Sequence, residues 1–381
     1  MLPIRVLVVD DAVVIRRMLV DILSAEPDIE VVGTAPNGRI TLAKIPQVEP
    51  DLITLDIEMP VMGGLECLAE IKQRYPKLPV IMFSTLTERG AAATLDALTL
   101  GASDYVTKPS QQGSLAAAAA RVREDLVPKI RALCPRPVAG CRPATGDRRP
   151  EPEEGPKAVR PLATARRTGR RGRVDVVAIG VSTGGPNALA TLIPALPSDL
   201  PVPVVVVQHM PPLFTKLLAD RLAAKSALRV SEAAAGVELR PGEVWIAPGD
   251  YHVCVQREAN RFVLMTHQGP AENSCRPSAD VLFRSVAEMY RDHALGIVLT
   301  GMGQDGLKGA ESIHRAGGRV LAQDEASSVV WGMPGLVSRA GIADRVMALD
   351  HIAPEIVSRL REWRVPATGA RREMGSQDGH S

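Results

Sequence analysis

Short apolar runs alternate with longer amphipathic segments over the first third of the chain. The runs at residues 4–9, 31–35, 51–56, 79–83 and 104–107 have the length of strands, and most are rich in valine, leucine and isoleucine. Segments with helical apolar spacing lie between them, and an alanine-rich one follows the last run. Because strands that alternate with helices form parallel sheets, the pattern predicts an α/β domain with a five-stranded parallel sheet wound on both faces.

The same alternation returns over the second half of the chain. Buried strands are expected at 176–179, within 201–210 and at 297–299, and a helix is expected over 307–316. The apolar runs VWIAPG, YHVCVQ and RFVLMT predict further strands, the last two joined by a hairpin turn at 257–260. The second half therefore predicts another doubly wound domain, Rossmann-like and mostly parallel, with a β-hairpin.

The segment between these two patterns differs from both in composition. Residues 134–173 hold seven prolines and 11 Lys/Arg against 4 Asp/Glu, whereas the chain on either side of them is slightly acidic. Such a segment, without apolar periodicity, is typical of a solvated linker, and docking to an acidic surface is the second interpretation. We expect a first domain at 1–125, a Pro/Arg-rich linker at 126–173, a second domain at 174–365 and a disordered tail at 366–381.

Composition narrows the classes of function. Aromatic residues make up only 3% of the chain and the basic excess lies in the linker, so no nucleic-acid partner is expected. No apolar run has the length of a membrane span, and acids stand where a signal peptide would continue, so we expect a cytoplasmic protein without membrane insertion. The five cysteines form no CxxC pair and are expected to be scattered reduced thiols.

Three carboxylates follow strands of the first domain. Asp10 and Asp11 end its first strand, and Asp56 ends its third. Because the carboxyl ends of parallel strands meet at one edge of the sheet, these carboxylates should converge, and their repulsion calls for a cation. Hard oxygen ligands suit Mg²⁺.

A hydroxyl and an ammonium group are expected at the same edge. Ser84 and Thr85 follow the fourth strand, and Lys108 follows the fifth. Taken singly, Asp11 also fits a helix cap and Lys108 a surface charge. Taken together, they predict a phosphate site made of a metal, a lysine and a hydroxyl, with Asp56 as the acceptor.

These motifs, VVDD, DIEMP and TKP at successive strand ends, resemble those of two-component response-regulator receiver domains, whose fold is flavodoxin-like. The resemblance covers residues 1 to about 125. It implies that Asp56 accepts phosphate from a chemotaxis histidine kinase and that Asp10 and Asp11, with Asp56, hold Mg²⁺. It further implies that Lys108 contacts the phosphoryl group.

The same resemblance assigns two switch residues. Ser84, the first residue after PVIMF, best matches the switch hydroxyl, and Thr85 is the less favoured choice. Tyr105 matches the switch aromatic residue.

A glycine-flanked serine follows the first strand of the second domain. Gly180 and Gly184 around Ser182 fit the GxSxG nucleophile elbow, in which a strand turns sharply into a helix, here with Pro186 at its start. The same composition also fits a turn that holds a phosphate at a helix N-terminus, as in nucleotide-binding domains. A base and an orienting acid at the same edge of the sheet would favour the interpretation of Ser182 as a nucleophile over that of a phosphate-binding turn.

Two residues elsewhere in the second domain supply that chemistry. His209 follows the strand within 201–210, and Asp305 follows the strand at 297–299, although alone the first fits a structural histidine and the second a helix cap. With Ser182 they form the serine, base and orienting-acid set of acyl transfer. Their chain order, Ser, His, Asp, disfavours the α/β-hydrolase fold, where the order is Ser, Asp, His.

The motifs GVSTGG, VVQHMP, RPSADVLF, LTGMGQDG and SSVVWGMPG, in this order behind a receiver, resemble the catalytic domain of the chemotaxis protein-glutamate methylesterase and glutaminase (CheB) family. The resemblance implies hydrolysis of glutamate γ-methyl esters on methyl-accepting chemoreceptors and deamidation of receptor glutamines. It implies Ser182 as nucleophile, His209 as base and Asp305 as the acid that orients the imidazole, with no cofactor in this domain.

Two further expectations concern the oxyanion and regulation. Backbone amides near Thr183 and Met302 are the candidates for the oxyanion hole, and Met302 equally fits a packing residue. The receiver is expected to cover the Ser182 edge until phosphate on Asp56 reorders the face that carries Ser84 and Tyr105.

Two functions of other classes remain open from the sequence. A receiver joined to a nucleotide-binding domain would use GVSTGG as a phosphate cradle but would leave His209 and Asp305 without a role. A transcriptional regulator would need a basic DNA-reading domain, whereas residues 174–381 carry 20 Lys/Arg against 22 Asp/Glu.

Overall fold

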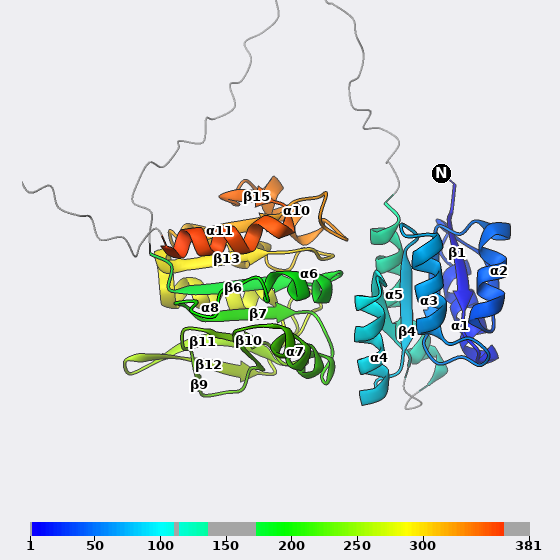
Figure 1. Ribbon diagram of the computed structural model, residues 1–381, viewed down its shortest axis with the longest axis horizontal. Coiled ribbons are helices and arrows are strands. Elements are labelled where there is room, and N and C mark those ends of the chain that lie inside the picture. The colour runs from blue at the N-terminus through cyan, green and yellow to red at the C-terminus, as the bar shows by residue number, and fades with distance from the viewer. Residues whose placement is uncertain (1, 110–113, 136–172, 362–381) are drawn as a thin grey trace, which may run out of the picture.

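The computed structural model describes residues 2–109, 114–135 and 173–361. These residues form two α/β domains that lie side by side (Figure 1). The tail expected at 366–381, most of the expected linker, and Cys141 lie outside the described residues. Within the described ranges, no helix combines the length and apolar character needed to cross a membrane.

The N-terminal domain is built on the five-stranded parallel sheet that the sequence predicts, in the order β2-β1-β3-β4-β5. Its strands are β1 (Ile4–Val9), β2 (Ile29–Ala35), β3 (Leu52–Asp56), β4 (Val80–Ser84) and β5 (Asp104–Thr107). Its helices are α1 (Val13–Ser24), α2 (Gly38–Val48), α3 (Gly64–Arg74), α4 (Glu88–Thr99) and α5 (Leu115–Leu133). Helices α1 and α5 pack on one face and α2, α3 and α4 on the other, which confirms the doubly wound prediction.

Helix α5 corrects the boundary expected at residue 125. The helix continues to Leu133, because Leu126, Val127 and Ile130 are buried in the core beside α1. Helical burial therefore extends the first domain eight residues into the segment that the sequence assigned to the linker.

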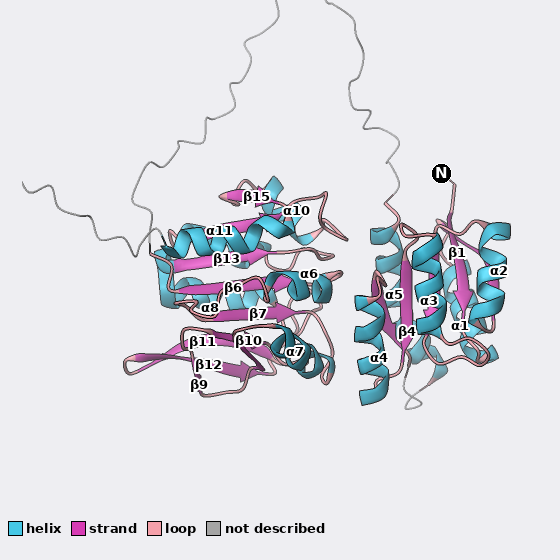
Figure 2. Cartoon of the chain, in the orientation of Figure 1, coloured by secondary structure: helices cyan, strands magenta, loops and turns pink. Residues whose placement is uncertain are grey.

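The C-terminal domain is built on a seven-stranded sheet in the order β15-β14-β13-β6-β7-β10-β8, and all of its strand pairs are parallel. Its strands are β6 (Val176–Val181), β7 (Val204–Gln208), β8 (Arg229–Glu232), β10 (Glu243–Ile246), β13 (Ala294–Val298), β14 (Arg319–Gln323) and β15 (Arg345–Met347). Its helices are α6 (Gly185–Leu192), α7 (Phe214–Lys225), α8 (Ala279–Tyr290), η1 (Arg291–His293), α9 (Leu307–Arg315), α10 (Met333–Arg339) and α11 (Leu349–Arg361). Figure 2 shows the helices lying along the strands.

The predicted hairpin joins β11 (His252–Glu258) to β12 (Arg261–His267) in antiparallel register. It belongs to a separate three-stranded sheet, in the order β11-β12-β9, in which β9 (Val237–Glu238) pairs with β12. The mostly parallel architecture with a hairpin is therefore confirmed, and the hairpin lies outside the main sheet.

Candidate active site and acidic site

Three neighbouring strands bring the predicted serine, histidine and aspartate to one edge of the C-terminal sheet. Ser182 follows β6, His209 follows β7, and Asp305 lies in the loop between β13 and α9. Since β13, β6 and β7 are adjacent and parallel, their carboxyl ends meet at the same edge.

The turn that carries Ser182 depends on small residues. Gly184 has a φ of 77°, in the left-handed region that glycine enters without strain. A Cβ at Gly185 would lie 1.9 Å from the side-chain oxygen Oε1 of Gln208, and a Cβ at Gly301 would lie 2.8 Å from Cβ of Ser182. The tight strand-to-helix turn predicted from the glycines is therefore present, and neighbouring backbone packs closely around the serine.

Gln208, at the end of β7, stabilises this turn through its side-chain amide. Its side-chain nitrogen Nε2 donates to the carbonyl oxygens of Ser182, at 3.0 Å, and of His209, at 3.3 Å. One buried amide thus links the backbone of the serine to that of the histidine.

His209 and Asp305 form a direct pair. His209 Nε2 lies 2.7 Å from Asp305 Oδ2. Asp305 is 2% exposed and accepts hydrogen bonds from the Ser278 hydroxyl at 2.7 Å and from the backbone amide of Ala279 at 2.6 Å. Burial alone would raise the pKa of Asp305, but the hydrogen bonds and charge of His209 outweigh burial and lower this pKa to about 2. Asp305 is therefore a carboxylate, and Nε2 of His209 carries the proton between them.

The other ring nitrogen of His209, Nδ1, faces the thiol of Cys275 at 3.6 Å. Burial lowers the pKa of His209, and the hydrogen bonds to Asp305 and Cys275 more than offset burial, so the pKa lies above its ordinary value.

The Ser182 hydroxyl makes no hydrogen bond with another described residue. Nδ1 is the ring nitrogen left to accept a proton, because Asp305 occupies Nε2.

The sequence did not single out the residues that hold this pair in place. Asn273 Nδ2 lies 3.0 Å from Asp305 Oδ1, and Ser278 and Cys275 contact the acid and the base respectively. Ser278 lies within RPSADVLF, a motif that carried the family resemblance but that gave no role to any single residue. Asn273 and Cys275 precede or flank this motif, and only the fold shows which way they face.

The two oxyanion candidates differ in their surroundings. The backbone N–H groups of Thr183 and of Met302 donate no hydrogen bond within the described part of the chain. The Thr183 side chain is 4% exposed, and its hydroxyl donates to Asp104 Oδ2 of β5 at 2.7 Å. Met302 is half-buried, between Gly301 and Gly303. Both amides stay free for a negatively charged oxygen.

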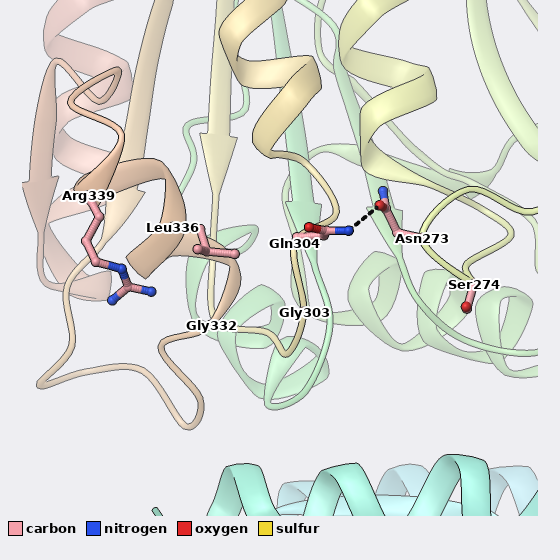
Figure 3. A pocket seen from close by; sticks show the side chains of 7 residues that line it. All are labelled: Asn273, Ser274, Gly303, Gln304, Gly332, Leu336 and Arg339. Atoms are coloured by element: carbon pink, nitrogen blue, oxygen red, sulfur yellow. Dashed lines mark hydrogen bonds between the residues drawn. The ribbon is translucent and has the colours of Figure 1, made fainter. Parts of the chain in front are cut away.

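A cavity of about 560 Å³ opens beside this edge (Figure 3). Gln304, which directly precedes Asp305, donates from Nε2 to Asn273 Oδ1 at 3.2 Å across its wall. The cavity is lined by Asn273, Ser274, Gly303, Gln304, Gly332, Leu336 and Arg339. A cavity next to the serine, histidine and aspartate can take a side chain of another molecule.

The acidic site predicted in the N-terminal domain is also assembled. Oxygen atoms of Asp10, Asp11 and Asp56 lie within 4.8 Å of one another. Lys108 Nζ lies 2.8 Å from Asp10 Oδ2 and 2.8 Å from Asp56 Oδ1. The carboxylates and the ammonium group therefore share one edge, as expected from the strand ends.

Asp56 is a buried carboxyl group beside Lys108. Burial raises its pKa to about 6, against the lowering effect of Lys108. Its second oxygen, Oδ2, is buried without a hydrogen-bond partner. An unpartnered buried carboxylate oxygen among three acids fits a hard divalent cation such as Mg²⁺.

The two switch candidates face different neighbours. The Ser84 hydroxyl is buried and donates to the carbonyl of Gly90 in α4 at 3.1 Å. Tyr105 stacks on Phe214 of α7, with ring centroids 5.0 Å apart and planes 8° from parallel. Thr85 bonds instead to the hydroxyl of Thr87, at 3.2 Å, at the start of α4.

Tyr105 belongs to a contact between the two domains. Arg221 of α7 bonds to Asp96 of α4 at 2.9 Å and donates to the carbonyl of Ala92 at 2.8 Å. Asn187 of α6 donates to the carbonyl of Leu98 at 2.7 Å. With the bond between Thr183 and Asp104, these contacts place α4 and β5 against the turn that carries Ser182.

Comparisons with known proteins match both domains. Residues 177–356 match the family model described as CheB methylesterase, and residues 6–120 match the response regulator receiver domain. A protein-glutamate methylesterase/protein-glutamine glutaminase of Trichodesmium erythraeum is 52% identical over 356 residues, covering 93% of this chain and 99% of the relative. One of a Nocardioides species is 53% identical over 371 residues, covering 96% and 98%. The Thermotoga maritima CheB methylesterase catalytic domain is 42% identical over 49% of this chain and 99% of its own, with a TM-score of 0.48.

Proposed function

This chain belongs to the CheB methylesterase family with a response regulator receiver domain, and we propose on that premise that it hydrolyses glutamate γ-methyl esters and deamidates glutamines of methyl-accepting chemoreceptors. The observation that carries the proposal is the hydrogen-bonded pair of His209 and Asp305 beside the turn of Ser182. A phosphate cradle at this turn would leave that pair without a use.

We assign the chemical steps to three side chains. Ser182 Oγ attacks the γ-carbonyl carbon of the substrate while its proton passes to His209 Nδ1. Asp305, held as a carboxylate by its hydrogen bonds, keeps the other ring proton on Nε2 and stabilises the imidazolium. The imidazolium then returns its proton to the leaving methanol oxygen or ammonia nitrogen, and water releases the acyl group from Ser182 by the same route.

The oxygen that becomes negative in the tetrahedral intermediate needs donors. The free backbone amides of Thr183 and Met302 support their role as these donors. The neighbouring cavity supports binding of a receptor segment that presents the γ-carbonyl to Ser182.

In the receiver domain we propose Asp56 as the phosphorylated residue and a chemotaxis histidine kinase as the phosphodonor. Asp10, Asp11 and Asp56 would hold Mg²⁺, which supplies charge neutralisation for phosphoryl transfer. Lys108 lies between Asp10 and Asp56, which supports a contact between its ammonium group and the transferred phosphoryl group.

Regulation is proposed to act through the contact between the domains. The bond from Thr183 to Asp104 and the stack of Tyr105 on Phe214 support a receiver that restricts the Ser182 edge. Ser84, whose hydroxyl bonds to α4, would turn toward a phosphoryl group on Asp56 and release α4 and Tyr105 from the catalytic domain.

The test is methanol release from methylated chemoreceptor membranes. The intact protein is measured with and without a small phosphodonor and Mg²⁺, against Ser182→Ala and a matched control, Ser312→Ala on α9, whose hydroxyl bonds within its own helix. We expect Ser182→Ala to lose activity by about three orders of magnitude or more and Ser312→Ala to keep it. Equal activity of Ser182→Ala and the parent protein would refute the assigned nucleophile, and no stimulation by phosphodonor would refute the regulation.

A further inference from the structure

A thiol and an imidazole meet at the ring nitrogen on which the proposed mechanism depends. Cys275 closes a tight turn with Glu272, and the turn residues Asn273 and Ser274 have φ values of 52° and 61°. This turn directs Cys275 Sγ to a point 3.6 Å from Nδ1 of His209. Cys275 is half-buried, and the His209 side chain is 12% exposed.

The separation of these two atoms matches a pair of metal ligands. Zinc lies about 2.3 Å from a thiolate sulfur and about 2.0 Å from an imidazole nitrogen, so tetrahedral geometry separates the two ligands by about 3.6 Å. The distance between Sγ and Nδ1 in this structure, 3.6 Å, agrees with that separation. Thiolate and imidazole ligands together select zinc over the hard cations Mg²⁺ and Ca²⁺.

The second nitrogen of His209 has the partner that a zinc-binding histidine requires. Nε2 shares its proton with Asp305 Oδ2 at 2.7 Å, which fixes the tautomer and leaves the lone pair on Nδ1. Asp305 is itself held by Ser278 and Ala279. A carboxylate oxygen of Asp305, a ring nitrogen of His209 and the Cys275 sulfur lie within 4.8 Å of one another, and here the carboxylate holds the imidazole while the other two groups are the ligands.

We propose that His209 Nδ1 and Cys275 Sγ form a zinc site that reversibly inhibits the esterase. Binding releases the thiol proton to water and places Zn²⁺ on the lone pair that would otherwise accept the proton of Ser182. Water molecules complete the coordination. The inference rests on the proposed function for its inhibitory effect, while the metal site itself rests on geometry alone.

The first experiment measures methanol release by the full chain at buffered free Zn²⁺ concentrations, with chelator added back at the end. We expect loss of activity that the chelator restores. In Cys275→Ser the concentration for half inhibition should rise by about tenfold or more, each variant being compared with its own metal-free rate. Inhibition of Cys275→Ser at the same concentration as the parent would overturn the site.

A matched control is a second thiol–imidazole pair. Cys254 Sγ lies 3.4 Å from His267 Nε2 on the hairpin of β11 and β12, and neither residue contacts His209. Cys254→Ser should keep the zinc inhibition of the parent protein. Loss of inhibition in Cys254→Ser, with inhibition retained in Cys275→Ser, would move the site to the hairpin and contradict the proposal.

The second experiment separates the metal site from the catalytic assignment. Co²⁺ bound to a thiolate gives a charge-transfer absorption band that needs no enzyme activity, and we expect this band in the intact protein and in Ser182→Ala. The band should be lost in Cys275→Ser and kept in Cys254→Ser. If the protein shows no esterase activity but this pattern holds, the proposed function fails and the zinc site stands. If Cys275→Ser keeps the band, the zinc site fails whatever the activity.

Discussion

At the scale of single residues, the proposed chemistry depends on which nitrogen of His209 carries a proton. Asp305 is a carboxylate because the hydrogen bonds to it stabilise negative charge, so the ring proton of neutral His209 belongs on Nε2. Sequence patterns identified both residues from their places after strands. They could not identify Cys275, because the side that it faces is set by the turn at Asn273 and Ser274.

The raised pKa of His209 predicts how activity depends on pH. Burial lowers this pKa, but the hydrogen bonds to Asp305 and Cys275 raise it further than burial lowers it. Neutral His209 is the base, so kcat/KM should rise with pH as the imidazolium loses its proton, with a midpoint above the ordinary value of about 6.5. In Cys275→Ala the midpoint should move to lower pH, measured by methanol release in zinc-free buffer. A rate independent of pH between about 6 and 9 would contradict this prediction.

Gly185 tests the packing of the serine turn. In Gly185→Ala the added methyl group would displace the Gln208 amide that links Ser182 to His209. We expect the esterase rate to fall by about tenfold or more, since a small displacement of reacting groups costs about that much. Gly33→Ala, whose Cβ would meet nothing closer than 3.4 Å, is the matched control and should keep the parent rate. Equal rates for the two variants would show that the turn tolerates the shift.

At the scale of elements, the apolar pattern predicted the strands of the N-terminal sheet, and it predicted β6, β7, β10 and β13 of the C-terminal sheet but not β8, β14 or β15. It did not predict which strands pair. The strand runs of the N-terminal domain lie where expected, and so do β6, β7 and β13. That β13 lies beside β6 is a matter of pairing between segments about a hundred residues apart, which no local pattern encodes, while β7, the next strand along the chain, lies on the other side of β6. The end of α5 was also missed, because proline and basic residues nearby hid its buried face.

The last turns of α5 should contribute to the stability of the receiver domain. Ile130 is fully buried, so Ile130→Ala removes core contacts and is expected to lower the free energy of unfolding by about 2–5 kcal/mol. Arg121→Ala, on the exposed face of the same helix, should change it by about 0.5 kcal/mol or less. Denaturant unfolding followed by circular dichroism measures both. An unchanged midpoint for Ile130→Ala would place residues 126–133 outside the domain.

At the scale of the whole molecule, two domains of one chain meet through α4 and β5 on one side and α6, α7 and the Ser182 turn on the other. The contact combines an aromatic stack with polar bonds, of which Thr183 to Asp104 is buried. The sequence led us to expect that the receiver covers the active edge, but the residues that meet there were unknown, since no motif marks a contact between domains.

Arg221 offers a test of this contact outside the catalytic groups. Arg221→Ala removes its bonds to Asp96 and to the carbonyl of Ala92. If these bonds stabilise the contact between the domains by about 1 kcal/mol, their loss shifts the equilibrium toward the open arrangement by about fivefold. The rate of methanol release by the unphosphorylated protein should then rise by up to that factor. Arg229→Ala, which removes a bond to Glu243 within the catalytic domain, should leave the rate unchanged. A higher rate in both variants would show that the effect does not come from the contact between the domains.

The same contact has a consequence for the signal that enters the protein. Phosphate on Asp56 is proposed to weaken the contacts that Tyr105 and Asp104 make with the catalytic domain. Because coupling between two sites is reciprocal, a ligand that binds at the Ser182 turn in the open arrangement must then favour the phosphorylated form by the same factor. A receptor segment bound at the active site would therefore stabilise the phosphorylated, active form of the protein. When the substrate is depleted, the equilibrium would return to the form in which the receiver covers the Ser182 edge.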